Sequence, residues 1–119
     1  MNFDESVIYL ESEDFSDDGQ LKVLKDKPVV ILLGGNFCGF CKAVKPIFQT
    51  FSTKVQNVYP ACILIDGSPS ERQLNQKMGK WLSDYKGVPT VIAYKNGKYL
   101  KTYKGPRTEI GLIEFAKGL

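Results

Sequence analysis

Cys38 and Cys41 are the residues of this sequence whose type and spacing suggest chemistry. They stand three positions apart in the segment Asn36-Phe37-Cys38-Gly39-Phe40-Cys41. Two thiols about one helical turn apart can close a disulfide, and in a chain without a cysteine framework such a pair indicates redox chemistry more readily than cross-linking. Because a thiol reacts as the thiolate, the first sulfur needs surroundings that lower its pKa.

The residues that follow the first cysteine predict a helix that begins there. Apolar side chains recur at helical spacing at Cys41, Val44, Phe48 and Phe51. The amino terminus of a helix offers unpaired N–H groups and the positive end of the helix dipole, and both favour a thiolate. We therefore expect Cys38 to attack a substrate disulfide and Cys41 to resolve the mixed disulfide that forms.

A metal site is the main alternative interpretation of a Cys-x-x-Cys pair. A zinc site built from Cys and His needs two more ligands, and the chain offers only Cys62 and no histidine. A metal or iron–sulfur centre would then require two chains to share their cysteine pairs. The absence of histidine also excludes hydrolases of the Ser-His and Cys-His types. We expect no metal and no cofactor.

The composition predicts a soluble globular protein, with 43% hydrophobic and 24% charged residues. A length of 119 residues predicts a single domain over 1–119. The longest apolar runs, 29–33 and 61–65, are far shorter than a bilayer span, and the chain shows no secretory or retention signal. We expect no membrane association, and the missing signals favour a cytoplasmic location.

The net charge of +3 is unevenly distributed. Residues 1–18 contain seven acids and no base, so the rest of the chain carries sixteen bases and six acids. The lysines among these bases are scattered singly, as is typical of a solvated surface. They do not form the run interleaved with aromatic residues that would indicate nucleic-acid binding. We expect no nucleic-acid partner.

The order of predicted elements indicates an α/β fold. Strands are expected at 7–10, 29–33, 61–65, 90–94 and 99–103, the last two joined by the hairpin turn Asn96-Gly97. Helices are expected within 11–24, from Cys38, from a Ser70–Gln73 capping box to Tyr85, and from Thr108, where Ile110, Leu112, Ile113 and Phe115 would pack on the sheet. This order predicts a mixed central β-sheet flanked by helices on both faces, parallel across helical connections and antiparallel in the hairpin.

Four motifs resemble the thioredoxin superfamily, above all a single catalytic domain of the protein disulfide isomerases. They are the strand 29–33 with Asn36 to Lys42 and Pro46, the segment Gly87-Val88-Pro89-Thr90, the turn Tyr94 to Lys98, and Thr102 to Thr108. Together they cover about residues 7–115 in the family's order. The resemblance implies a thioredoxin fold and a thiol–disulfide oxidoreductase or isomerase that acts on proteins or peptides.

The resemblance also assigns roles to matching residues. It implies a cis Val88-Pro89 bond, with the Val88 backbone pairing with an extended substrate segment. Arg107 matches an arginine that stabilises the resolving thiolate in disulfide isomerases, although a surface arginine beside Thr108 is the alternative. The other expected substrate contacts are Phe37, Gly39, Phe40 and Gly105, with Phe40 the most exposed.

Two residues depart from the family pattern. Leu32 and Cys62 stand where the family usually has a buried acid and its lysine partner. Replacing both the acid and the lysine avoids leaving one buried charge without a partner. The loss of the acid implies that Cys41 has no built-in base for its deprotonation. Cys62 is expected to be a small buried hydrophobe, with an alternative disulfide to Cys41 as the competing hypothesis.

The direction of exchange stays open at this point. Gly39-Phe40 matches neither the Gly-Pro common in thioredoxins nor the Gly-His common in disulfide isomerases. We expect a monomer whose partners are protein or peptide dithiols and disulfides, together with a reductase or oxidase that recycles the pair. The alternative is a redox-inert thioredoxin-fold module that binds peptides in the same groove.

Overall fold

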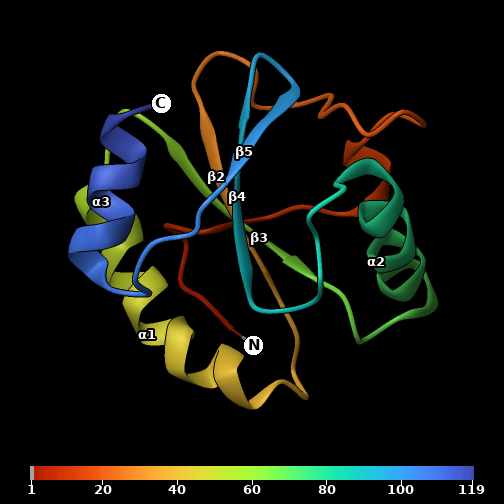
Figure 1. Ribbon diagram of the computed structural model, residues 1–119, viewed down its shortest axis with the longest axis horizontal. Helices are drawn as coiled ribbons and strands as arrows, with labels where there is room; N and C mark the ends of the chain where they lie inside the picture. The colour runs from red at the N-terminus through yellow and green to blue at the C-terminus, as the bar shows by residue number, and fades with distance from the viewer. Residues whose placement is uncertain (1) are drawn as a thin grey trace.

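A five-stranded sheet forms the centre of the computed structural model, which describes residues 2–119 (Figure 1). Its spatial order is β1-β3-β2-β4-β5. The strands are β1 (Ile8–Tyr9), β2 (Val29–Gly34), β3 (Tyr59–Leu64), β4 (Thr90–Lys95) and β5 (Lys98–Thr102). The predicted mixed sheet and the hairpin at Asn96-Gly97 are confirmed.

The strand directions add one pairing that the sequence did not predict. β3 is parallel to β1 and β2, and β4 is antiparallel to β5. β4 is also antiparallel to β2. The rule for parallel strands joined through a helix does not apply to β4, because β4 follows β3 in the chain without lying beside it in the sheet.

The helices cover both faces of the sheet, as predicted. They are α1 (Gly39–Lys54), α2 (Pro69–Trp81) and α3 (Glu109–Lys117), with a short 3-10 helix, η1 (Ser12–Asp14). Figure 1 shows α1 and α3 on one face and α2 with η1 on the other. Within residues 2–119 no helix is both long enough and apolar enough to cross a membrane.

Alternate residues of β2 fill two separate cores. Ile31 and Leu33 pack in the core that includes Met78 of α2. Leu32, on the opposite face, packs in the core that includes Phe48 of α1. The aliphatic run that predicted this strand is therefore buried on both faces, as expected for a strand at the centre of a sheet. The chain leaves this central strand and then enters α1.

The helix predicted within 11–24 is wrong beyond η1. Leu21 instead forms an isolated antiparallel bridge with Phe15, and both side chains are buried. The Leu21 N–H donates to the carbonyl of Gly97 at 2.7 Å, and the Tyr94 hydroxyl donates to the carbonyl of Gly19 at 2.7 Å. The backbone polar groups of this segment therefore form hydrogen bonds with the distant β4–β5 hairpin and not within a local helix.

The predicted ends of α2 are also corrected. Ser68, not Ser70, caps the helix, and Glu71 completes the capping box. Pro69 takes the first helical position, where a missing N–H costs nothing, so the helix begins earlier than predicted. The helix ends at Trp81 instead of continuing to Tyr85.

The cap of α3 is confirmed, but one of its predicted core residues is not. The Thr108 hydroxyl accepts the N–H of Gly111 at 3.0 Å. Leu112 and Ala116, one turn apart, form the buried face of the helix. Ile110 lies outside that face and is 74% exposed, so it does not pack on the sheet.

Candidate active site

Cys38 and Cys41 form a disulfide at the start of α1, with their Cα atoms 5.2 Å apart. Cys38 is the N-cap residue and Gly39 the first residue of the helix, so the predicted helix start is confirmed. Cys38 is half-buried, whereas Cys41 is 0% exposed. A macromolecular partner therefore reaches the sulfur of Cys38 before that of Cys41.

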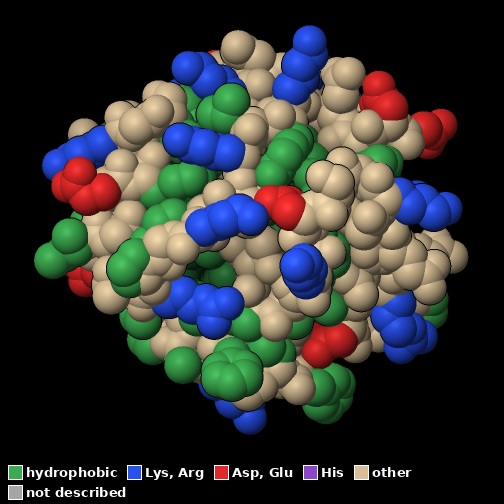
Figure 2. All heavy atoms as spheres, viewed as in Figure 1, with side chains coloured by type: hydrophobic (Ala, Val, Ile, Leu, Met, Phe, Trp, Pro, Cys, Tyr) green, Lys and Arg blue, Asp and Glu red, His purple; other side chains and the backbone are tan. Residues whose placement is uncertain are grey.

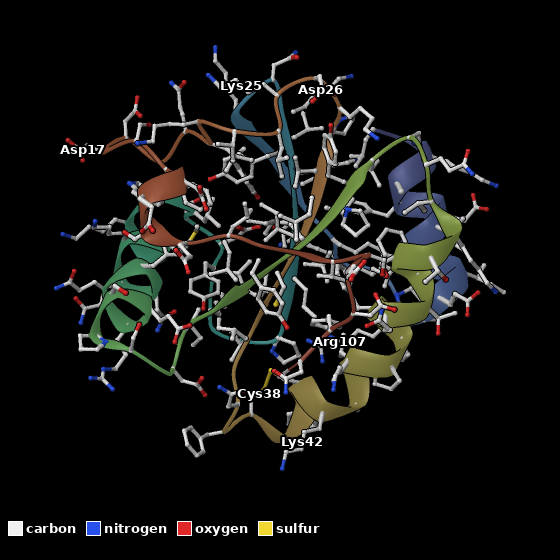
Figure 3. All side chains as sticks on the ribbon, turned by 180° about the vertical axis from the view of Figure 1, so that it is seen from behind. Asp17, Lys25, Asp26, Cys38, Lys42 and Arg107 are labelled. Atoms are coloured by element: carbon white, nitrogen blue, oxygen red, sulfur yellow. A yellow bond between two sulfur atoms is a disulfide. The ribbon has the colours of Figure 1, made fainter. Side chains whose placement is uncertain are left out.

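The backbone around Cys38 favours negative charge on its sulfur. The Cys41 N–H donates to the Cys38 Sγ at 3.1 Å, and the first turn of α1 contains no acidic residue. Free N–H groups at a helix start stabilise a thiolate in the same way as they bind other anions. Figure 3 shows Lys42 directed into solvent, so the helix backbone is the nearer source of this effect.

Asp66 holds the turn that leads to Cys38, a role that the sequence did not predict. Its Oδ1 accepts the N–H of Asn36 and its Oδ2 accepts the N–H of Phe37, both at 2.9 Å. Gly35 leaves room for the carboxylate, since a Cβ there would come within 2.5 Å of Oδ2. Asp66 follows β3, so only the pairing of β3 with β2 reveals that it faces this turn.

We expect Asp66→Ala to lower the free energy of unfolding of the oxidised protein by about 1 kcal/mol. The reason is that the N–H groups of Asn36 and Phe37 lose a charged acceptor and form hydrogen bonds with water instead. Urea unfolding measures this loss. Asp66→Asn, which keeps one acceptor oxygen, should lose less. Asp17→Ala is the control, because Asp17 is an exposed acid in a loop, whereas Asp66 is half-buried. An equal loss in the Asp66→Ala and Asp17→Ala variants would show that Asp66 does not support the turn.

The Val88-Pro89 peptide bond is cis, as the resemblance implied. Thr90 pairs with Leu33 in the sheet, so Pro89 lies at the end of the sheet from which the chain continues to Cys38. Among residues 2–119, no hydrogen bond engages the backbone amide or carbonyl of Val88. These groups are free for pairing with another polypeptide segment.

Arg107 contacts the cis-proline segment. A guanidinium N–H donates to the carbonyl of Pro89 at 3.2 Å, and Figure 3 shows Arg107 near the end of the sheet that carries Cys38. Gly105 lines the same cavity as Pro89 and Arg107. The structure thus brings three predicted site residues together, while the role of Arg107 at the resolving thiolate stays a prediction.

Two exposed aromatic side chains flank Cys38. Phe37 is 89% exposed and Phe40 is 74% exposed, so Phe40 is exposed as predicted but Phe37 is more so. Figure 2 shows hydrophobic side chains gathered at the lower edge of the molecule, where Figure 1 places the start of α1. Gly39 lies between these two aromatic residues in the chain, and no atom lies within 4 Å of the position that a Cβ would take there. The surface beside the disulfide is therefore apolar and open.

Leu32 and Cys62 are paired neighbours on β2 and β3, and both are fully buried. They lie in the core beneath α1, which also contains Phe48. Desolvation in this core raises the pKa of Cys62 to about 12. Within residues 2–119, no three Cys, His, Asp or Glu side chains gather in a way that would hold a metal ion.

We expect Cys62 to remain unmodified when the reduced, folded protein is treated with iodoacetamide at pH 8, because a buried thiol with a raised pKa has almost no thiolate. Mass spectrometry should show a label on Cys38 and none on Cys62 in the folded protein, and a label on Cys62 after unfolding in urea. A label on Cys62 in the folded protein would contradict its assignment as a core residue.

Comparison with known proteins gives a consistent result. The thioredoxin family model matches residues 6–118. The putative thioredoxin-like protein 453L of Invertebrate iridescent virus 6 is 33% identical over 109 residues, with 79% of each chain covered. Among solved structures, a mutant thioredoxin from Halobacterium salinarum NRC-1 has a TM-score of 0.69 at 18% identity, covering 99% of this chain and 94% of that one. The first thioredoxin domain of mouse protein disulfide-isomerase A4 has a TM-score of 0.70 at 19% identity, covering 98% and 77%.

Proposed function

Because this chain belongs to the thioredoxin family and is a thiol–disulfide oxidoreductase, we propose that Cys38 is its nucleophile and Cys41 its resolving thiol. The observation that carries this assignment is the contrast in access: Cys38 is half-buried at the helix start, while Cys41 is fully buried behind it. The substrates we propose are disulfides and dithiols of proteins or peptides.

The exchange proceeds in two steps. The Cys38 thiolate attacks one sulfur of the substrate disulfide, and the other substrate sulfur leaves as a thiolate that takes up a proton. The Cys41 thiol then loses its proton and attacks the Cys38 sulfur. This forms the Cys38–Cys41 disulfide, releases the second substrate thiolate and completes the transfer of two electrons to the substrate. A dithiol or a reductase must reduce the pair before the next cycle, and the reverse sequence oxidises a substrate.

The cis-proline segment is proposed to hold the substrate chain. The free amide and carbonyl of Val88 lie at the end of the sheet from which the chain leads to Cys38, so an extended peptide can pair with them. The exposed rings of Phe37 and Phe40 supply apolar contact on the other side of the disulfide. Gly39 leaves space between those rings for the substrate backbone.

We further propose that the protein isomerises disulfides as well as reducing them. With Leu32 in the core and no buried carboxylate among residues 2–119, Cys41 must lose its proton to water or to another group. Slower deprotonation prolongs the mixed disulfide at Cys38. A longer-lived mixed disulfide gives the bound substrate time to rearrange its own disulfides before release.

Two assays of the wild-type protein test these proposals. Insulin reduction with dithiothreitol reports the reductase activity, and reactivation of scrambled ribonuclease in a glutathione buffer reports isomerisation. We expect catalysis in both. Reduction without reactivation would reject the isomerase proposal alone. Inactivity in both, with binding of an unfolded peptide retained, would instead identify a redox-inert binding module.

A further inference from the structure

A cavity of about 290 Å³ opens beside the cis-proline. Pro89 and Thr90 form one wall, and the loop between β5 and α3, which includes Gly105, forms another. Cavities that enclose drug-sized ligands measure about 300–1,000 Å³, so this one is suited to a single side chain or a short peptide segment. It directly adjoins the backbone that we propose holds the substrate.

The charged residues around this cavity are mostly cationic. Its lining includes Lys86, Lys104 and Arg107 and one acid, Asp84. Figure 2 shows Lys and Arg side chains gathered around an acidic side chain over the loop between β5 and α3. The lining therefore has an excess of positive charge.

Asp84 is already engaged by its neighbours. Its carboxylate lies 3.3 Å from the Lys104 Nζ and accepts the Thr102 hydroxyl at 3.2 Å. Burial acts to raise the pKa of Asp84, but the hydrogen bond and charge of Lys104, together with the Thr102 hydroxyl and a backbone hydrogen bond, outweigh it and hold that pKa below its usual value. Asp84 thus stays ionised and offsets Lys104, and it leaves the other two cations uncompensated.

Lys86 and Arg107 are those two cations. Within the described part of the chain, Lys86 forms no ion pair. Arg107 uses one of its N–H groups on the carbonyl of Pro89, and a guanidinium carries five. Both therefore have donors left for an anionic group in the cavity.

From this arrangement we infer that the cavity binds the side-chain carboxylate of an acidic residue that lies near the disulfide of the substrate polypeptide. Lys86 and Arg107 are its ligands, and the backbone at Val88 and Pro89 sets its register. This inference rests on the proposed function, since it assigns a substrate preference to the same site. It predicts faster exchange with disulfides that have acidic neighbours.

The test uses the reduced protein and matched pairs of disulfide peptides that differ only by Glu or Gln at one position, with that position moved in turn along both flanks of a cysteine. The second-order rate of reduction is measured for each peptide by stopped-flow fluorescence. We expect the Glu peptide to react about fivefold faster than its Gln partner at the position that reaches the cavity, a size typical of a partly exposed ion pair. The ratio should fall as salt is added.

Variants of Lys86 supply the decisive comparison, because Lys86 is exposed and its replacement removes no core contact. Lys86→Gln should bring the Glu-to-Gln rate ratio close to one, and Lys86→Glu should make the Glu peptide the slower of the two. Lys98→Gln is the matched control, since Lys98 lies at the opposite end of the β4–β5 hairpin, and it should keep the wild-type ratio.

The outcomes separate this inference from the proposed function. Equal rates for Glu and Gln peptides at every position, or a preference that persists unchanged in Lys86→Gln, would overturn the carboxylate subsite while leaving the exchange activity intact. Failure to reduce any of the peptides would overturn the proposed function, and the subsite would fall with it.

Discussion

Replacing Cys38 with serine is expected to lower kcat/KM for insulin reduction on the order of 10⁴-fold or more, as the loss of a covalent nucleophile does in other enzymes. A serine hydroxyl stays protonated at neutral pH, so the helix start has no thiolate to stabilise. The two remaining thiols, Cys41 and Cys62, are fully buried and cannot take over the attack. The turbidity of precipitating insulin chains follows the reaction.

Two further cysteine variants control this experiment. Cys62→Ala removes a thiol that is also buried but outside the pair, and we expect it to retain most of the activity. Cys41→Ser should accumulate a mixed disulfide between Cys38 and the substrate, visible as a mass increase that dithiothreitol reverses. Retained insulin reduction in Cys38→Ser, or a mixed disulfide at Cys62, would show that the nucleophile is misassigned.

We expect Leu32→Asp to destabilise the oxidised protein by about 3–5 kcal/mol, the cost of an uncompensated buried charge. Leu32 is fully buried, and its neighbour on β3 is Cys62 rather than a lysine. Burial without a cation raises the pKa of the introduced carboxyl above its value in the unfolded chain. The folded state then binds the proton more tightly, so the loss of stability grows as the pH rises and shrinks as it falls towards pH 4.

Urea unfolding at pH 4 and pH 8 measures this effect. Leu32→Asn is the matched control, because it has nearly the same shape as the aspartate variant but no charge. The free energies of unfolding of the two variants should lie closer together at pH 4 than at pH 8. A difference that is the same at both pH values would show that the position is hydrated and is not part of the core.

Local patterns were enough to predict the elements whose contacts lie close in sequence. The apolar spacing after Cys38 predicted the start of α1, and Asn96-Gly97 predicted the hairpin because both residues adopt the positive φ that this turn needs. The cap of α2 was misplaced because Ser68 and Ser70 both begin capping-box patterns. Pro69 favours the earlier one.

Features that depend on distant segments could not be predicted in this way. The segment around Leu21 is not helical, because its N–H bonds to Gly97 across the molecule. Asp66 supports the turn before Cys38 only because β3 lies beside β2. Lys86 and Arg107 come from different loops, and the cavity that they line exists only after the chain has folded. The cysteine pair and its place at a helix start were therefore predictable from the sequence, whereas the contacts of Asp66 and the position of Lys86 were not.

The pH dependence of alkylation of the reduced protein tests the central assignment most directly. Rates of iodoacetamide modification at Cys38 and Cys41 are followed separately by mass spectrometry. We expect Cys38 to react first, with a half-maximal rate clearly below about pH 8.5, the midpoint for an ordinary cysteine. A midpoint at or above that value, or earlier modification of Cys41, would contradict the assignment of Cys38 as the activated nucleophile.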